Sequence, residues 1–297
     1  MKNNTKLLVS LIFINLLLLS AVFSLAFLIQ GNSIVKISTM TNNSVVSNAE
    51  SIKSLNVAAK AYIIYDTASR SVIAGKNEYL RFAPASSAKI MAAIIVLDKY
   101  NLDDILVANN VDSVVGSRMY LREGEMISVR NLLYGMMLPS GNDAAFLLAQ
   151  NYPGGVSFFV DAMNQKAKTL SMNNTKFFDP DGYDDQNFTT AFDLSRLAAY
   201  AMQNPTFAKI VGTKETTVTD SSGRIIHQLA NLNELLGANG VTGVKTGFTD
   251  EAGGVLVTSI KNGKKTYVVV VLGSQDRFGD TQNIIKNAIN NLHLILY

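Results

Sequence analysis

The sequence predicts an α+β fold: one antiparallel sheet built from N- and C-terminal segments, flanked by helices, with an all-helical lobe inserted between them. Three observations predict it. Residues 61–74 have the β-branched and aromatic content of a hairpin, residues 132–202 carry helical patterns, and strand patterns return after residue 213. Strands this far apart in sequence share one sheet if the helices between them form a separate lobe, which leaves a cleft between the two lobes.

The individual elements follow from local patterns. An apolar run at residues 90–97 is long enough, and rich enough in Ala and Met, for a buried helix. Thr190, with Asp193 three residues later, is a capping-box-like helix start, and Asn262-Gly263 between two β-branched runs is the strongest short hairpin signal in the chain. The remaining predictions are helices at residues 132–137, 143–150, 158–170 and 191–202, strands at residues 61–66, 71–74, 216–219, 224–228, 255–260 and 266–272, and a last helix with Ile284, Ile285, Ala288, Ile289, Leu292, Ile295 and Leu296 on the face that packs on the sheet.

Composition excludes several classes of function. The chain has 297 residues, of which 48% are hydrophobic and 16% charged, enough apolar material for a large core. Its net charge of +3 is spread without a basic run, so we expect no nucleic-acid partner. There is no cysteine and there are only two histidines, which excludes disulfides and thiolate or histidine-rich metal sites. His227 lies in an alternating stretch and is interpreted as a strand residue, not as a catalytic base.

The amino terminus predicts a membrane segment. Residues 7–29 carry no charge, follow Lys2 and Lys6, and are long enough to cross a bilayer as a helix. The lysines should remain in the cytoplasm, so the rest of the chain would lie on the extracytoplasmic face of the cell membrane. Length favours an uncleaved anchor; cleavage after Ser24-Leu25-Ala26 is the alternative and would release a secreted protein.

Three regions are therefore expected. Residues 1–30 form the transmembrane anchor or signal peptide, and residues 31–57, rich in Ser, Asn and Thr, form a flexible stalk. Residues 58–297 form the folded domain, with the helical lobe at about residues 100–212.

A serine and a lysine occupy the start of the buried helix. In Ser86-Ser87-Ala88-Lys89 the two side chains are three residues apart and face the same way on a helix. A lysine enclosed by apolar residues loses hydration, which favours the neutral amine and makes it a usable base. Free N–H groups at a helix start can also stabilise an oxyanion.

Single motifs are weak evidence, but their order is informative. Ser33 and Lys36 repeat the first spacing, and Ser-x-Asn occurs at residues 54–56 and 171–173 as well as in Ser140-Gly141-Asn142. Each motif alone could be structural: a solvated helix charge, a turn or cap, or a strand entry. Together they run as Ser-x-x-Lys, then Ser-x-Asn between two predicted helices, then Lys245-Thr246-Gly247 just before a strand, as in penicillin-binding proteins and class A β-lactamases.

From about Ala61 to Arg277 the chain resembles the low-molecular-mass penicillin-binding proteins, the serine D-alanyl-D-alanine carboxypeptidases, which have a β-lactamase/transpeptidase-like fold. The resemblance extends beyond the three motifs. It is carried by residues 84–91, 132–145, 231–236 and 244–253.

The resemblance implies a role for each motif residue. Ser86 would attack the carbonyl between the two D-alanines and form an acyl-enzyme, with Lys89 as base and Ser140 as proton relay to the leaving amine. Lys245 and Thr246 would hold the terminal carboxylate. The implied catalytic residues are Ser86, Lys89 and Ser140, and the implied substrate-binding residues are Asn142, Lys245, Thr246, Gly247 and Phe248, with the backbone N–H groups of Ser86 and Phe248 as oxyanion hole. The implied partners are the peptidoglycan stem peptide and β-lactam antibiotics as covalent inhibitors, and no metal or cofactor is required.

Asn187 stands where relatives often have His, a change outside the motifs. A class A β-lactamase would need a Glu-directed water, and no Glu-x-x-Leu-Asn segment lies between Ser140 and Lys245. A D,D-endopeptidase or a transpeptidase shares the acyl-enzyme and stays open. A non-catalytic envelope protein that binds wall peptides is the alternative of another class, and retention of every motif residue argues against it.

Overall fold

The computed structural model describes residue 55 and residues 57–289. The predicted membrane segment at residues 7–29, almost all of the stalk, and Leu292, Ile295 and Leu296 of the last predicted helix lie outside the described residues. Within the part that is described, no helix is long and apolar enough to cross a membrane.

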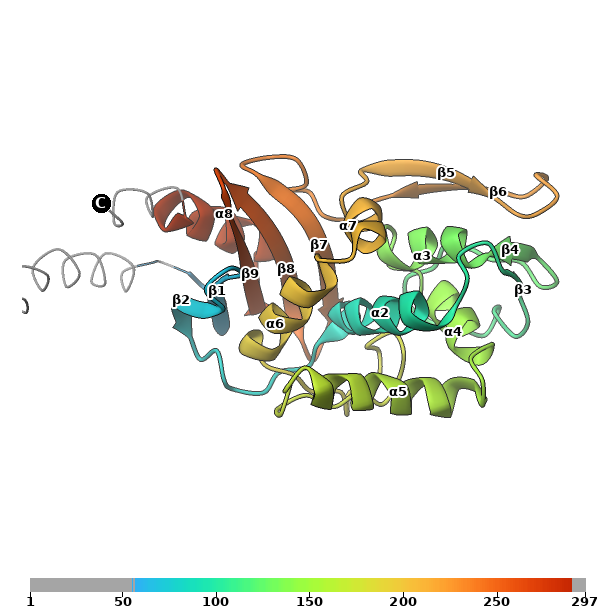
Figure 1. The fold of residues 1–297 in the computed structure, drawn as a ribbon, viewed down its shortest axis with the longest axis horizontal. Helices are drawn as coiled ribbons and strands as arrows, with labels where there is room; N and C mark the ends of the chain where they lie inside the picture. The colour runs from blue at the N-terminus through green and yellow to red at the C-terminus, as the bar shows by residue number, and fades with distance from the viewer. Residues whose placement is uncertain (1–54, 56, 290–297) are drawn as a thin grey trace, which may run out of the picture. The chain divides into compact units, whose positions relative to one another are not determined.

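A five-stranded antiparallel sheet forms one lobe (Figure 1). Its strand order is β2-β1-β9-β8-β7, so the first two strands of the domain pair with the last. The predicted sheet from both ends of the chain is thereby confirmed. The bounds are β1 Ala61–Asp66, β2 Ser71–Lys76, β7 Val241–Thr249, β8 Gly253–Asn262 and β9 Lys265–Ser274.

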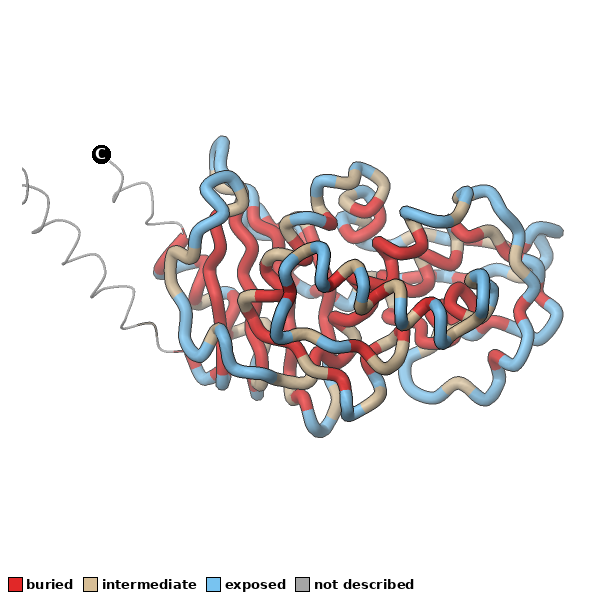
Figure 2. The backbone as a smooth tube through the Cα atoms, turned by 60° about the horizontal axis from the view of Figure 1, so that its bottom comes forward, coloured by how far each residue is buried: buried red, intermediate tan, exposed pale blue. Residues whose placement is uncertain are grey.

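The central strands are apolar because both faces of the sheet are covered. β9 contains four consecutive valines, Val268 to Val271, and all are buried. Helix α6 (Ala191–Ala201) lies on one face and α8 (Arg277–Asn287) on the other, and in a second view these strands are buried along most of their length (Figures 1 and 2). The β8–β9 hairpin is confirmed, but its turn is Gly263-Lys264, one residue later than predicted, with Gly263 at φ 59°.

The helical lobe is packed around α2 (Lys89–Lys99). Residues 89–96 of α2 are all buried, as expected for a helix that is apolar on every side. It contacts helices on several sides, and Thr190 caps α6 through the amide of Asp193, as predicted. The remaining helices are α3 Val129–Met137, α4 Asn142–Gln150, α5 Gly155–Thr169 and α7 Pro205–Val211, and two small hairpins are formed by β3 Ile105–Val107 with β4 Met126–Ser128 and by β5 Glu215–Thr219 with β6 Ile226–Ala230.

Two placements from sequence were wrong. The strands predicted at residues 216–219 and 224–228 were expected in the single sheet, and they form the separate two-stranded sheet of β5 and β6. Lys245-Thr246-Gly247 was expected just before a strand, and it lies inside β7 at the edge of the sheet. Gly243 and Gly247 lower the strand propensity of this segment, so the pattern did not stand out. The backbone is nevertheless paired with β8 from Val241 to Thr249, because packing within the sheet overrides local propensity.

Candidate active site

Ser86 lies in a short 3₁₀ turn, Ala85–Ala88, that leads directly into α2. Ala85 has φ 45°, a strained left-handed conformation of the kind that concentrates at functional sites. Gly182, at φ +83°, packs against this turn so closely that a Cβ atom there would lie 1.9 Å from the carbonyl oxygen of Ala85. The turn that carries Ser86 is thus packed against the backbone of Gly182, and a residue with a Cβ atom would not fit there.

Lys89 joins three segments. Its Nζ donates to Ser86 Oγ at 2.9 Å, to Asn142 Oδ1 at 2.7 Å and to the carbonyl oxygen of Asp181 at 2.9 Å. The side chain is fully buried. The predicted Ser-x-x-Lys pair is therefore in direct contact, and Asn142 of the second motif meets it there.

Burial also changes the acidity of this lysine. Desolvation lowers the pKa of Lys89 to about 8, although the carboxylates of Asp181, Asp179 and Asp143 oppose the shift. About one tenth of the amine is therefore unprotonated at pH 7, far more than for a lysine of ordinary pKa. The geometry and the acidity together equip Lys89 to accept the proton of Ser86.

Ser140 and Asn142 form the helical side of the site. Ser140 is buried at φ 67°, and its Oγ has no hydrogen-bond partner among the described residues. An unpaired hydroxyl in a strained backbone is costly, and such features mark functional sites. Asn142 is the first residue of α4, and its Nδ2 donates to the carbonyl oxygen of Val115 at 2.8 Å.

Strand β7 forms the other side. Lys245 is 1% exposed, and its Nζ donates to the carbonyl oxygen of Thr246 at 3.0 Å. Burial first, and then the positive charges of Lys89 and Arg277, hold the pKa of Lys245 well below its usual range. Within the described part of the chain no carboxylate forms an ion pair with it. Burial without a counter-charge disfavours the ammonium form of Lys245, and a bound anion would favour it, so this is a place for an anion.

Gly247 lets β7 approach the nucleophile. A Cβ atom at this position would lie 3.1 Å from both the backbone nitrogen of Ser86 and the Cβ of Ala85, tighter than most real contacts. Thr246 is buried beside Lys245, and Phe248, 61% exposed, stands near the end of the strand. The eight predicted site residues thus belong to three chain segments that meet at Ser86: Lys89 contacts both Ser86 and Asn142, and Gly247 packs against Ser86.

Comparison with known proteins identifies the family. A sequence profile for D-alanyl-D-alanine carboxypeptidases, peptidase family S11, matches residues 46–276. The chain belongs to this family.

Its relatives include D-alanyl-D-alanine carboxypeptidase DacF of Bacillus subtilis, which is 33% identical over 224 residues covering 73% of this chain and 57% of DacF. A D-alanyl-D-alanine endopeptidase of Pseudomonas aeruginosa is 35% identical over 236 residues, 77% of this chain and 76% of that protein. The crystal structure of the Streptomyces K15 DD-transpeptidase superimposes with a TM-score of 0.75 at 33% identity, covering 79% of this chain and 98% of that one. The predicted transpeptidase-like fold is confirmed.

Two residues near the site of this family member were missed by sequence reasoning. The carbonyl of Asp181 accepts a hydrogen bond from Lys89, and the guanidinium of Arg277 adds positive charge at Lys245. A backbone acceptor carries no sequence signal, because any residue supplies a carbonyl. Arg277 could have been noticed only as a lone cation beyond the last predicted strand.

His227 lies away from these residues, in β6, as the strand interpretation required. Its Nδ1 faces the carbonyl oxygen of Met119 at 3.0 Å and its Nε2 faces Glu125 Oε1 at 2.7 Å. A ring protonated on both nitrogens satisfies both acceptors, and the hydrogen bond to Glu125 raises the pKa of His227 above its usual value. The histidine thus fastens the β5–β6 hairpin to the rim of the cleft.

Proposed function

We propose that this chain is a serine D-alanyl-D-alanine carboxypeptidase that removes the terminal D-alanine from peptidoglycan stem pentapeptides through an acyl-enzyme on Ser86. The observation that carries the proposal is the contact of the buried Lys89 Nζ with Ser86 Oγ at 2.9 Å, beside a lysine on the opposite wall that has no counter-charge among the described residues. Membership of the carboxypeptidase family supports the same reaction.

Acylation begins at the Ser86–Lys89 pair. The neutral amine of Lys89 takes the proton from Ser86 Oγ while the oxygen attacks the carbonyl carbon between the two D-alanines. The backbone N–H groups of Ser86 and Phe248 are proposed to stabilise the oxyanion of the tetrahedral intermediate. Because only the unprotonated amine can act, the rate of acylation is expected to fall as the pH drops below about 8, the pKa of Lys89.

The intermediate collapses when the C–N bond breaks. The leaving nitrogen of D-alanine must gain a proton, and the buried, unpaired Ser140 Oγ, two residues before the Asn142 that contacts Lys89, is the proposed relay. Water then adds to the ester carbonyl, Ser86 Oγ leaves with a proton, and the shortened peptide is released. Lys89 returns to its starting protonation state.

Lys245 and Thr246 are proposed to bind the carboxylate of the last D-alanine. Burial of Lys245 without an anionic partner in the described part of the chain makes a negatively charged substrate end favourable there. This contact requires a carboxylate beside the scissile bond, which the terminal D-alanine supplies and which a cross-link supplies only where the leaving residue carries one. The endopeptidase alternative is kept because a relative of 35% identity has that name.

Residues 7–29 are proposed to anchor the enzyme in the cell membrane, with the catalytic domain at residues 58–297 on the extracytoplasmic face. The uncharged length of this segment and the two preceding lysines support the proposal. Fractionation of cells that express the full chain checks it, since an uncleaved anchor keeps the protein with the membranes after a high-salt wash.

The deciding experiment is covalent labelling with a fluorescent penicillin. We expect the wild-type chain to be labelled and Ser86→Ala to remain unlabelled while folding normally. Release of D-alanine from a pentapeptide then identifies a carboxypeptidase, cleavage of a cross-linked dimer identifies an endopeptidase, and rapid turnover of the penicillin identifies a β-lactamase. An unlabelled wild-type protein would contradict the enzymatic function and favour a wall-binding protein.

A further inference from the structure

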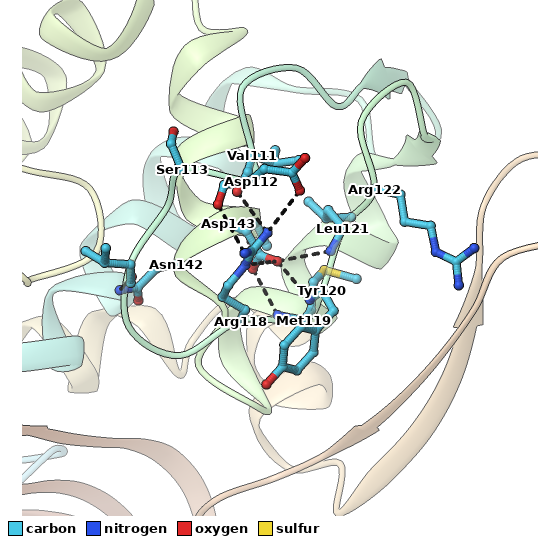
Figure 3. A network of polar contacts seen from close by, with 12 residues as sticks. Val111, Asp112, Ser113, Arg118, Met119, Tyr120, Leu121, Arg122, Asn142 and Asp143 are labelled. Carbon is cyan, nitrogen blue, oxygen red and sulfur yellow. Dashed lines mark hydrogen bonds and ion pairs between the residues drawn. The ribbon is translucent and has the colours of Figure 1, made fainter.

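A buried carboxylate next to the Ser-x-Asn motif organises one rim of the cleft. We call residues 111–125 the rim loop. The side chain of Asp143 is 0% exposed. Its Oδ1 accepts from the backbone N–H of Met119 at 2.9 Å, and its Oδ2 accepts from those of Tyr120 at 2.8 Å and Leu121 at 3.1 Å (Figure 3). Three successive amides of the rim loop thus converge on one carboxylate.

Arg118 reinforces this attachment. Its Nε lies 3.7 Å from Asp143 Oδ2, and its Nη2 donates to the carbonyl oxygen of Val111 at 2.9 Å (Figure 3). The guanidinium therefore ties the beginning of the rim loop to the same carboxylate that holds residues 119–121. Asp143 also lies in the first turn of α4, where a negative charge is favoured by the helix dipole.

The rim loop in turn grips Asn142. The backbone N–H of Asn142 donates to the carbonyl oxygen of Ser117 at 2.7 Å, and its Nδ2 donates to that of Val115 at 2.8 Å. An amide has a donor end and an acceptor end, so holding Nδ2 on Val115 leaves Oδ1 facing Lys89. The ammonium form of Lys89 can only donate and so favours the same orientation, while the acceptors of the rim loop at Ser117 and Val115 hold the backbone N–H and the Nδ2 of Asn142 in place.

We propose that Asp143 is a positioning residue for acyl transfer: by holding the rim loop in place, it keeps the Asn142 amide oriented toward Lys89. The inference rests on the proposed reaction at Ser86. Asp143, the residue directly after the Ser-x-Asn motif, acts in that reaction through Asn142 and does not touch the substrate.

A pair of glycines tests the link between the loop and Asn142. Gly116 and Gly124 lie in the same rim loop at φ +88° and φ +78°, so alanine brings similar backbone strain at both. A Cβ atom at Gly116 would lie 2.5 Å from Asn142 Nδ2, whereas at Gly124 it would meet nothing within 4 Å. We expect Gly116→Ala to slow penicillin acylation about 10- to 100-fold per folded protein and Gly124→Ala to leave it near the wild-type rate.

A pair of aspartates tests the carboxylate itself. Asp143→Asn keeps the shape but loses acceptors for Tyr120 and Leu121. The control is Asp193→Asn, since Asp193 is also buried and its Oδ2 accepts a backbone amide, from Asn174 at 3.0 Å, away from the cleft. We expect Asp143→Asn to slow acylation about 10- to 100-fold and Asp193→Asn to affect stability alone.

The pH dependence separates positioning from a structural role. Lys89 is faced by the carboxylates of Asp181, Asp179 and Asp143, by the amide oxygen of Asn142 and, from β7, by the amine of Lys245. Turning the amide away removes a hydrogen bond to the ammonium form, which lowers the pKa of Lys89. The acid limb of the acylation profile should therefore move to lower pH in Gly116→Ala and stay in place in Gly124→Ala. In Asp143→Asn the loss of the carboxylate charge alone lowers the pKa of Lys89, so the glycine pair carries this test.

The outcomes are distinct. If the wild-type chain is not labelled by penicillin, the proposed function fails. If it is labelled, but Gly116→Ala and Asp143→Asn acylate at the wild-type rate or no more slowly than their controls, the function stands and this inference is overturned. If Asp143→Asn does not fold, the glycine pair decides the question alone.

Discussion

The two walls of the cleft are held in different ways. On the sheet side, Lys245, Thr246 and Gly247 sit on a strand whose position is set by a regular backbone ladder with β8. On the helical side, Ser140 is itself in a left-handed conformation, and Asn142 depends on the rim loop, whose own position depends on side chains such as Asp143. A ladder fixes a wall without using its side chains, whereas the helical wall is fixed by them.

The two buried lysines reflect this contrast. Lys89 donates to three oxygens from three segments, so it holds these segments together as well as contacting Ser86. Lys245 is equally buried, but among the described residues its Nζ hydrogen-bonds to the neighbouring carbonyl of Thr246 alone. On the helical wall, Lys89 therefore has its hydrogen-bond partners before substrate binds. On the sheet wall, Lys245 has no anionic partner among the described residues, and the substrate carboxylate is proposed to supply one.

The largest effect is expected from Lys89→Met. Removal of the base should reduce the rate of penicillin acylation about 100- to 10,000-fold. It also leaves Asn142 Oδ1 and the carbonyl of Asp181 without their donor, so the free energy of unfolding should fall. Acylation kinetics and urea unfolding measure the two effects. A variant that acylates within a few-fold of the wild type would remove Lys89 from the mechanism.

Lys245→Met is expected to separate function from stability. Loss of the charged contact to the substrate carboxylate should lower kcat/KM for a pentapeptide about 10- to 100-fold. The free energy of unfolding should rise by about 1 kcal/mol, because a buried charge without an anionic partner among the described residues is replaced by an apolar side chain of similar volume.

A pentapeptide with an amidated C-terminus is the matched control. The wild type should discriminate against it and Lys245→Met should not. Equal discrimination by both proteins would show that the carboxylate is recognised elsewhere.

The smallest effect concerns His227, which fastens the β5–β6 hairpin to the carbonyl of Met119 and to Glu125. The pKa of His227 is raised in the folded state, so the stability gained from its protonation is fully present below its unfolded value near 6.5 and is lost as the pH rises through the folded value. His227→Gln should therefore cost about 1 kcal/mol more at pH 6 than at pH 9. Urea unfolding of both proteins at these two values provides the measurement, and a difference that grows with pH would contradict the assignment.

Much of the fold could be predicted because its long elements carry strong patterns. The valine run of β9 and the apolar run of α2 are examples, and both are confirmed. The three-residue strands β3 and β4 are too short to show a period. Helix α7 was missed although its signal was present: Asn204 caps it and Pro205 is its first residue.

The candidate site could be assembled from sequence only as a set of ordered motifs. The contact between Ser86 and Lys89 follows from their spacing, and the structure has it. The hydrogen bond from Asn142 Nδ2 to the carbonyl of Val115 joins residues 27 positions apart in sequence, and no local pattern encodes such a contact. Asp143 was visible as an acid in the first turn of a helix, but that position alone indicates only a favourable helix dipole.

The strand order determines when, during synthesis of the chain, the active site can form. β1, near residue 61, is hydrogen-bonded to β9, near residue 270, so the sheet lacks its centre until almost the whole domain has been synthesised. A nascent chain that already contains Ser86 and Lys89 still lacks β7 and the wall on which Lys245 lies. Since pairing between such distant segments is slow, reactivity toward penicillin should arise late and abruptly during folding, together with closure of the sheet.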